Sequence, residues 1–282
     1  MMLTGKARLA GVIGWPISHS LSPALHGFWI RELGLDAAYV PLAVRPEDFR
    51  NVVSILPLMG FRGVNVTLPH KEAAFQLSET RDDAAAATGA VNTLVFEGGR
   101  VHGRNTDVTG YLASLDEAGV GVLEGKSAVV LGAGGAARAV IFGLVSRGLG
   151  RVCIVNRSLE KAAALASFFG DRVSAQPWGE LAQALGSADL LVNTSSLGMA
   201  GQPGLDVDVG WLKSGAVVSD IVYRPLETQL LADARSRGLK TVDGLGMLLH
   251  QARAGFNAWF DANAHVTPEL RRHLLSILEG KS

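Results

Sequence analysis

The feature that most constrains the fold of this chain is a short apolar run that leads directly into a glycine-rich turn. The run at 127–131 is followed by Gly132-Ala133-Gly134-Gly135-Ala136-Ala137, which fits the pattern G-x-G-x-x-G/A. Between a buried strand and a helix, such glycines permit a tight turn and let the backbone approach an anion, which the first N–H groups of the helix can bind. The sequence therefore predicts a dinucleotide site in which residues 132–136 hold the diphosphate.

The chain around this turn alternates apolar runs with amphipathic stretches. Strands are predicted at 127–131, 151–155, 172–176, 189–193, 216–222 and 239–242. Helices are predicted at 135–147, 158–169, 178–185 and 226–237. Continuous apolar strands alternating with helices are typical of a doubly wound, Rossmann-like parallel sheet with both faces covered.

The residues before this region predict a second α/β unit. Its strands are expected at 9–14, 37–43 and 63–67, its helices at 22–33, 46–59 and 70–78, and a hairpin joins 91–96 to 100–104 across Gly98-Gly99. Two final helices, at 245–261 and 268–279, should return to this first unit. We therefore expect a substrate-binding catalytic domain formed by 1–106 plus 243–282 and a nucleotide-binding domain formed by 107–242.

Charge and composition narrow the class of partner. Lys and Arg number 26, as do Asp and Glu, so net charge offers no bulk attraction for nucleic acid or an anionic membrane. The longest apolar region, 128–145, contains Arg138 and several glycines, and we expect no membrane segment. Cys153 is the only cysteine, which suits a cytoplasmic protein, and the histidines show no spacing typical of a metal site. A net charge of zero is compatible with a monomer or a homodimer.

The end of the second predicted strand indicates which dinucleotide is bound. An NAD site usually has a carboxylate there, but this chain has Asn156, Arg157 and Ser158, with Lys161 one helical turn later. Two cations can bind the 2′-phosphate of NADP, and Arg157 can do so with a bidentate fork. NADP is therefore favoured, although both cations could instead be solvated residues at a helix start. Thr194, Ser195 and Val222 follow later strands and should also face the cofactor.

A lysine at a strand-to-helix junction is the first candidate for acid–base chemistry. The strand around Asn65 and Thr67 stops at Pro69, which suits the first turn of a helix and leaves Lys71 near the helix N-terminus. An ammonium is electrostatically misplaced at the positive end of a helix dipole, which favours proton exchange. The alternative is a solvated surface lysine.

Two further polar clusters precede helices or flank the hairpin. Asn92-Thr93 and Asn105-Thr106-Asp107 should lie at the same end of the hairpin and could converge on one ligand, although Asp107 could instead be the N-cap of a helix at 108–118. The hydroxyl-rich segment 18–23 opens another helix at Pro23, with Ser22 as its expected N-cap. Hydroxyls and helix N–H groups there could bind a small carboxylate.

With these motifs the chain resembles the shikimate dehydrogenases, NADP-linked enzymes that interconvert 3-dehydroshikimate and shikimate in aromatic amino-acid biosynthesis. The resemblance covers nearly the whole chain. It rests on GWPISHSLSP at 14–23, NVTLPHKE at 65–72, GAVNT at 89–93, NTD at 105–107, the glycine loop, Asn156-Arg157, and DGLGM at 243–247 with Gln251.

The resemblance implies a role for each site residue. Lys71 and Asp107 would be the catalytic pair. Ser20 and Ser22, helped by Tyr223, would hold the substrate carboxylate. The residues implied to bind ring hydroxyls are Asn65, Thr67, Asn92 and Gln251, and in the last motif Gly244 and Met247 are assigned to the cofactor.

The chain departs from the commonest family pattern at two positions, and three alternative functions remain open. His70 stands where many members have Phe, which we interpret as simple packing, and Val108 stands where glycine is frequent. The nearest alternative is a quinate/shikimate or aminoshikimate dehydrogenase with broader substrate or NAD use. A non-catalytic NADP-sensing module and a serine hydrolase built on Ser20 or Ser22 are weaker, because the catalytic pair is intact and a G-x-S-x-G elbow is absent.

Overall fold

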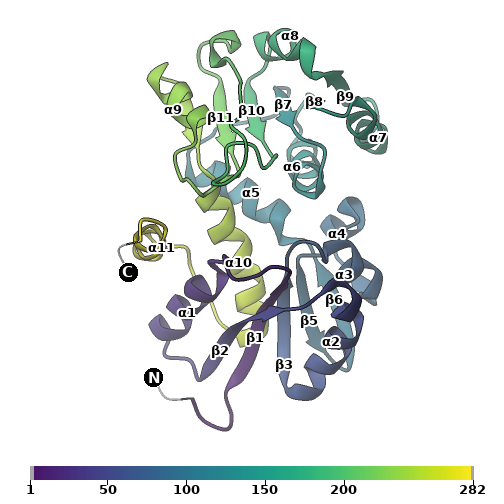
Figure 1. Cartoon of the computed structure of the whole chain (residues 1–282), viewed down its shortest axis with the longest axis vertical. Helices are drawn as coiled ribbons and strands as arrows, with labels where there is room; N and C mark the ends of the chain where they lie inside the picture. Colours follow the sequence, from purple (N-terminus) through teal and green to yellow (C-terminus); the bar gives the residue numbers. More distant parts are fainter. Residues whose placement is uncertain (1–2, 281–282) are drawn as a thin grey trace. The chain divides into compact units, whose positions relative to one another are not determined.

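The computed structural model describes residues 3–280 of the chain, which form two compact units. The first unit ends at Thr106 and resumes at Leu249, and the second is Asp107–Leu248. Helices α5 (Thr106–Glu117) and α10 (Gly244–Phe260) carry the chain across the two boundaries (Figure 1). We expected a domain boundary at 242/243, just before α10. The boundary between the compact units instead falls within that helix, after Leu248.

A six-stranded mixed sheet forms the centre of the first unit, in the order β2-β1-β3-β5-β6-β4. Strands β1 (Arg8–Gly14), β2 (Ala37–Ala43) and β3 (Phe61–Val66) are parallel. The hairpin strands β5 (Thr93–Glu97) and β6 (Arg100–Arg104) add antiparallel, and β4 (Thr80–Arg81) closes the edge. The carboxyl ends of β1 and β3 therefore lie side by side, which brings the segments after Gly14 and Val66 together.

Helices cover both faces of this sheet (Figure 1). On one face are α2 (Phe49–Ile55), α3 (Lys71–Leu77) and α4 (Asp83–Thr88), with Phe49, Val53 and Leu56 packed against β3 and β5. The other face carries α1 (Ser22–Glu32) and the second half of α10, where aromatic rings pack together, and α11 (Pro268–Leu278) contacts α1. Burying apolar side chains on both faces stabilises the strands that position the polar residues at their ends.

The second unit is a fully parallel sheet in the order β9-β8-β7-β10-β11-β12. Its strands are β7 (Ser127–Leu131), β8 (Arg151–Asn156), β9 (Val173–Pro177), β10 (Leu190–Asn193), β11 (Val217–Asp220) and β12 (Lys240–Val242). The intervening helices are α6 (Gly135–Ser146), α7 (Leu159–Phe169), α8 (Leu181–Gly186) and α9 (Gln229–Ser236). This is the strand order 3-2-1-4-5-6 of a dinucleotide-binding fold, and the predicted fold class is confirmed.

Alternating residues of β7 show why the central strand is apolar along its whole length. Ala128 and Val130 pack in the core shared with α5, α6 and α7. Val129 and Leu131 pack in the core on the opposite face, with residues of α8 and α9. Ligands of such a sheet bind beyond the carboxyl ends of its strands, where the order reverses between β7 and β10.

The structure differs from the predicted elements in several places. The single helix expected at 46–59 is α2 flanked by two 3₁₀ segments, Pro46–Asp48 and Leu56–Met59, because Pro57 cannot donate to the helix. The short β4 and α4 were not predicted, since an alanine-rich stretch of six residues has little periodicity. Strand β11 ends at Asp220 rather than at residue 222, because the Asp220 carboxylate accepts the Val222 N–H in place of a neighbouring strand.

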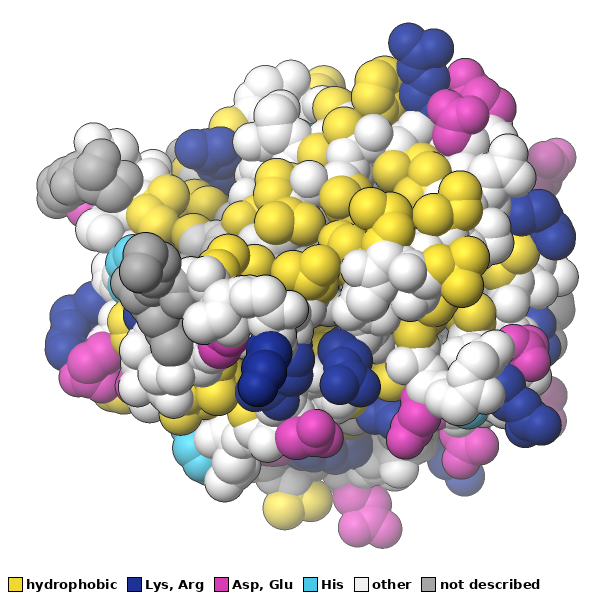
Figure 2. All heavy atoms as spheres, turned by 90° about the horizontal axis from the view of Figure 1, so that it is seen from below, with side chains coloured by type: hydrophobic (Ala, Val, Ile, Leu, Met, Phe, Trp, Pro, Cys, Tyr) yellow, Lys and Arg dark blue, Asp and Glu magenta, His cyan; other side chains and the backbone are white. Residues whose placement is uncertain are grey.

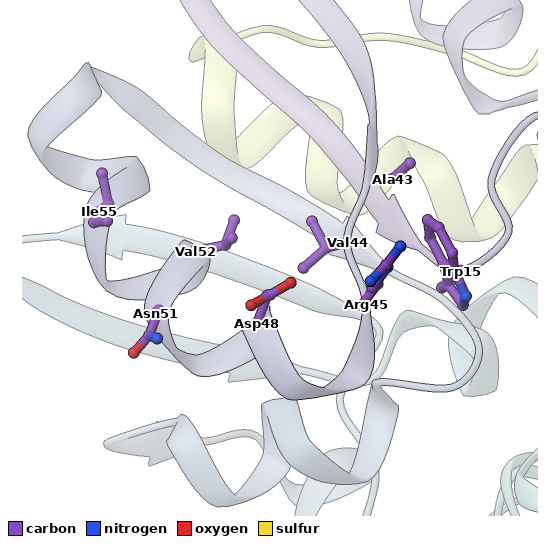
Figure 3. Close-up of a pocket in the computed structure, with 8 residues that line it drawn as sticks. All are labelled: Trp15, Ala43, Val44, Arg45, Asp48, Asn51, Val52 and Ile55. Atoms are coloured by element: carbon purple, nitrogen blue, oxygen red, sulfur yellow. The ribbon is translucent and has the colours of Figure 1, made fainter.

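The surface of the first unit includes a hollow of about 350 Å³ beside β2 and α2 (Figure 3). The Arg45 guanidinium lies over the Trp15 ring at its rim, 5.6 Å from the centroid. None of the predicted site residues lines this hollow. Figure 2 shows apolar side chains lying between charged ones on the face that it views. Ile55 at the end of α2, and Leu58 and Met59 in the 3₁₀ segment after it, are exposed. Within residues 3–280, helices long and apolar enough to span a bilayer are absent.

Candidate active site

Five polar side chains, four of them buried and one half-buried, form one hydrogen-bond network in the first unit. Asn65 lies near the end of β3, Asn92 precedes β5, Thr93 begins β5, Thr106 begins α5 and Gln251 lies on α10. Asn65 Nδ2 donates to Thr93 Oγ1 at 3.1 Å, and Asn92 Nδ2 donates to Thr106 Oγ1 at 3.0 Å. Gln251 Oε1 accepts from both Asn92 and Thr106 at 3.4 Å. The structure thus brings together three predicted ligands of ring hydroxyls.

The threonines of this network had no predicted role, although both stand in the NT motifs of the sequence. Thr93 Oγ1 donates to Asn92 Oδ1 at 3.0 Å, and the Thr106 N–H donates to the same oxygen at 2.8 Å. Both residues therefore hold the Asn92 amide in place. The sequence signal that could have indicated this is the repeated Asn-Thr pair, which stands just before the first hairpin strand and again just after the second.

Tyr39 was also missed by the sequence reasoning. It lies on β2, and its hydroxyl donates to Asn65 Oδ1 at 2.6 Å in a buried contact. A tyrosine in an apolar strand normally predicts only core packing. The contact with Asn65 depends on the registers of β2 with β1 and of β1 with β3, which the sequence does not show.

Lys71 and Thr67 flank the turn between β3 and α3. The Thr67 N–H donates to the Ile13 carbonyl at 2.9 Å, so the turn is held against the end of β1. Lys71 is the first residue of α3. We expected Pro69 in the first turn of this helix, but it lies in the turn before the helix. The Lys71 carbonyl accepts from the Val91 N–H at 3.0 Å. This bond places Lys71 beside the segment that leads through Asn92 into β5.

His70 is a packing residue, as predicted. Its ring is buried and stacks on Phe49, with centroids 4.6 Å apart and planes 7° apart. Its Nε2 lies 2.8 Å from the Val44 carbonyl oxygen. The imidazole therefore fills an aromatic position and also fastens the start of α3 to the segment after β2.

The two serines of the first motif lie at the start of α1, but Ser22 is not its N-cap. Helix α1 begins at Ser22, and Leu21 occupies the cap position with helical dihedral angles. Ser20 Oγ accepts the Ser22 N–H at 3.3 Å, so Ser20 provides the acceptor for the first N–H of the helix. Ser22 is buried and Ser20 is half-buried.

Asp107 is not an N-cap either. Helix α5 begins two residues earlier than expected, at Thr106, whose N–H donates to Asn92 Oδ1. Asp107 is buried in the first turn of α5, where the helix dipole favours a carboxylate. It directly follows Thr106 of the hydrogen-bond network.

In the glycine loop of the second unit, Gly132 is required by the fold itself, whereas Gly134 and Gly135 leave space for a ligand. Gly132 has φ +108°, and a Cβ there would lie 2.9 Å from Thr194 Oγ1, so a side chain is excluded by conformation and space. A Cβ on Gly134 or Gly135 would meet open space. Gly134 is the N-cap of α6 and provides no side-chain cap. The first N–H groups of α6 are thus accessible to an anion, in a loop that also contains Ala133 and Ala136.

The end of β8 offers cations and no carboxylate at 155–158. Asn156 Nδ2 donates to the Ser158 carbonyl at 2.9 Å, which shapes the turn. Ser158 caps α7 and accepts from the Lys161 N–H at 3.4 Å. Arg157 and Lys161 are exposed at this turn. The donor set fits the 2′-phosphate of NADP better than an unmodified ribose.

A second set of polar contacts organises the ends of β7, β10 and β11. Thr194 Oγ1 donates to the Leu131 carbonyl at 2.7 Å, next to Gly132. Ser195 Oγ donates to Asn193 Oδ1 at 2.7 Å. Asn193 and Asp220 fall within the predicted strands 189–193 and 216–222, and the sequence reasoning gave their side chains no role of their own. Strong hydrogen-bonding side chains in two otherwise apolar strands were the available signal.

The remaining predicted cofactor residues lie beside these strand ends. The N–H of the buried Val222 donates to Asp220 Oδ1 at 3.0 Å. Gly244 begins α10 so close to the Ile221 and Val222 carbonyls that a Cβ would collide with them. Met247 packs at the edge of the core, and Tyr223 is half-buried, with burial raising the pKa of its phenol. The Asn193 side chain bonds to Asp220 and so connects this region to the end of β10.

Among residues 3–280, three or more His, Cys, Asp and Glu side chains do not gather anywhere in a way that could hold a metal ion. The predicted site residues instead include amides, hydroxyls and one lysine in the first unit, and glycines, cations and the Asp107 carboxylate in the second. Such groups bind hydroxylated and phosphorylated ligands and exchange protons.

Two family models match the chain. One is described as a shikimate dehydrogenase substrate binding domain and matches residues 12–94. The other is described as shikimate / quinate 5-dehydrogenase and matches residues 114–199. The first model thus covers Ser20, Asn65, Lys71 and Asn92, and the second covers the glycine loop.

Similar proteins span almost the whole chain. A protein of Rhodopseudomonas palustris (strain HaA2) named shikimate dehydrogenase (NADP(+)) is 55% identical over 272 residues, 96% of this chain and 97% of the relative. The crystal structure of shikimate 5-dehydrogenase from Thermus thermophilus with NADP(H) and shikimate is 38% identical, with TM-score 0.84, covering 95% and 99% of the two chains. Quinate dehydrogenase from Corynebacterium glutamicum with NAD is 31% identical, with TM-score 0.89, covering 96% and 99%.

Proposed function

The chain belongs to the shikimate dehydrogenase family, and on this premise we propose that it catalyses the reversible NADPH-dependent reduction of 3-dehydroshikimate to shikimate. The observation that carries the proposal is the amide and hydroxyl network of Asn65, Asn92 and Gln251 next to Lys71, in a chain that also contains the glycine loop and Arg157. Relatives at 50–55% identity are named NADP-dependent shikimate dehydrogenases.

The first unit, in this proposal, binds the substrate. Ser20 and Ser22 bind its carboxylate, together with Tyr223 from the second unit. The ligands of its ring hydroxyls are Asn65, Thr67, Asn92 and Gln251. Amides and hydroxyls suit this task because each can donate and accept, and they keep a neutral polyol ring in one orientation.

Lys71 and Asp107 move the proton. The Lys71 ammonium donates to the oxygen of the ring ketone as it becomes an alkoxide, and the proton leaves the alcohol by the same route in the oxidation direction. Asp107 orients the ammonium and shares its proton. Proton transfer by a positioned group contributes about 10²–10⁴-fold to the rate.

The second unit holds NADP, which supplies a hydride when bound in its reduced form. Residues 132–136 and the start of α6 hold the diphosphate, and Asn156, Arg157, Ser158 and Lys161 hold the ribose 2′-phosphate. Further contacts come from Thr194, Ser195, Val222, Gly244 and Met247. The open space at Gly134 and Gly135 supports this assignment, because the backbone there can approach a ligand.

Quinate and NAD are the competing substrates, since a quinate dehydrogenase with NAD has a similar structure. Arg157, the lack of a carboxylate at 155–158 and the names of the relatives favour NADP and shikimate. A cytoplasmic location and a monomer or homodimer remain expectations from the sequence.

The test is kcat/KM for shikimate and for quinate, each with NADP and with NAD, followed by nicotinamide absorbance. Strong preference for shikimate with NADP supports the proposed function. Comparable use of quinate or NAD would assign the chain to the broader dehydrogenases, and no turnover with any pair would favour a non-catalytic NADP-binding module.

A further inference from the structure

The hydrogen bonds of Asn65 determine which way its amide faces. One side of the amide lies 3.3 Å from the Asn92 carbonyl oxygen, which can only accept, so this side must be the NH₂ group. The same NH₂ donates to Thr93 Oγ1 at 3.1 Å. Both amide hydrogens are therefore used inside the protein, and Oδ1 is the atom that faces Tyr39.

Tyr39 must then be the donor in its 2.6 Å contact with Asn65 Oδ1. Burial raises the pKa of the Tyr39 phenol well above its usual value, so the phenol keeps the proton that it donates. Oδ1 has two lone pairs, of which Tyr39 occupies one. His26 is adjacent to Asn65, but neither ring nitrogen of His26 has a hydrogen-bond partner among the described residues. The hydrogen-bonding capacity left to Asn65 is therefore one acceptor position and no donor.

The fold holds the Tyr39 ring rigidly in this position. Tyr39 pairs with Ala10 of β1, and Ala10 pairs with Gly63 of β3, so three residues in register share one face of the sheet. Asn65 is two residues beyond Gly63 and faces the same side. The small side chains at Ala10 and Gly63 leave room for aromatic rings to lie across β1.

Two aromatic neighbours fill that room. The His26 ring stacks on Tyr39, with centroids 3.9 Å apart and planes 5° apart. The Trp259 ring lies 6.0 Å from Tyr39, and its Nε1 donates to the Leu94 carbonyl at 2.9 Å. A Cβ on Gly63 would collide with Trp259. His26 is fully buried, and burial lowers its pKa to about 3, so it packs as a neutral ring.

We propose that Tyr39 is a positioning residue that locks the Asn65 amide with its remaining acceptor turned toward the substrate, so that Asn65 accepts a hydrogen bond from a ring hydroxyl. The inference rests on the proposed function, because it concerns the same substrate. It assigns to this position a hydroxyl that is present in both substrate and product, since a ring ketone there would face an acceptor and could not bond to it.

The first test is Tyr39→Phe, which removes the donor and keeps the ring. We expect KM for shikimate, and Kd for shikimate measured by calorimetry without cofactor, to rise about 3- to 10-fold, the effect of losing one hydrogen bond. We expect kcat and KM for NADP to stay within about twofold, because Tyr39 acts on binding rather than on the reacting atoms. Tyr111→Phe is the matched control, since Tyr111 is a buried tyrosine of the second unit whose hydroxyl lies beside Ser219 rather than beside Asn65.

The second test separates an effect through Asn65 from other roles of Tyr39, including an effect on Ser22, which is also adjacent to the phenol. In an Asn65→Ala background, adding Tyr39→Phe should raise Kd for shikimate no further. Asn65→Ser replaces Asn65→Ala if thermal unfolding shows that the latter does not fold. An additive double variant, or a Tyr39→Phe variant with unchanged Kd, would overturn the inference. A wild-type protein that neither binds nor oxidises shikimate would instead overturn the proposed function.

Discussion

Asn193 Nδ2 donates a hydrogen bond to Asp220 Oδ1 at 3.0 Å, and this contact joins the ends of two neighbouring parallel strands. Asp220 also accepts from the Val222 N–H at 3.0 Å and from Thr228 Oγ1 at 2.8 Å. One carboxylate therefore fixes the turn after β11, beside the residues assigned to the cofactor. Despite these bonds, burial raises the pKa of Asp220 to about 6.

Asp220 should make stability depend on pH in a definite direction. Its pKa is about 6 in the folded protein against an ordinary value of 3.8, so between these two values the folded protein keeps a proton that the unfolded chain releases. The free energy of unfolding should therefore fall as pH rises through this window. Asp220→Asn should stabilise the protein by about 2–3 kcal/mol at about pH 8 and leave it nearly unchanged at about pH 4.

Urea unfolding at the two pH values measures this difference. Asp206→Asn is the control, because Asp206 is exposed. Equal effects of Asp220→Asn at both pH values would show that Asp220 is ionised normally in the folded protein.

Arg157 should determine the choice between NADP and NAD. Arg157→Ala removes one charge-assisted contact to the 2′-phosphate, and we expect KM for NADP to rise about 10- to 150-fold. KM for NAD should stay within about twofold, since NAD has no phosphate at this position. Arg151→Ala, at the other end of β8, is the control. Equal losses with both cofactors would contradict the assignment.

The sequence predicts the second unit well for a physical reason. A fully parallel sheet needs continuous apolar strands and intervening amphipathic helices, and each of these is a local pattern. The glycine loop and the residues after β8 are also local, so both were located before the structure. The strand order and the Asn193–Asp220 contact depend on pairing between distant segments, which local patterns do not specify.

The first unit shows the limits of the same reasoning. Asn92 and Gln251 are 159 residues apart, and only the fold shows that they meet. Tyr39 was missed because its role depends on the register of three strands. The caps expected at Ser22 and Asp107 were wrong because both helices begin earlier than expected, at Ser22 and Thr106, whose N–H groups donate to Ser20 Oγ and Asn92 Oδ1. A cap predicted from one residue type ignores such competitors.

Gly134 should be needed for binding and not for folding. Its Cβ would meet open space, and its φ of −93° is accessible to alanine, so Gly134→Ala should leave the melting temperature within about 2 °C of wild type. A methyl group at the start of α6 should block the approach of the diphosphate and weaken NADP binding at least about tenfold. Gly179→Ala, which also adds a Cβ in open space, should change neither quantity. Unchanged Kd for NADP in Gly134→Ala would contradict the diphosphate site.

His70 should affect stability and not the chemical step. His70→Phe keeps the stack on Phe49 and loses the bond to the Val44 carbonyl, so the free energy of unfolding should fall by about 1 kcal/mol. We expect kcat to stay within about twofold over roughly pH 6–9. A changed pH profile of kcat would show that the imidazole acts on Lys71 electrostatically rather than by packing.

Lys71 should be the residue whose loss affects the chemical step most. Lys71→Ala removes the proposed proton donor but no part of the amide network, so kcat should fall about 10²–10⁴-fold, while Kd for shikimate changes less than about fivefold. Single-turnover absorbance measures the chemical step, and calorimetry measures binding. Lys6→Ala, at an exposed lysine of the same unit, is the control. If Lys71→Ala keeps near wild-type kcat, another group donates the proton, and if it loses binding and rate equally, Lys71 holds the substrate and does not exchange protons with it.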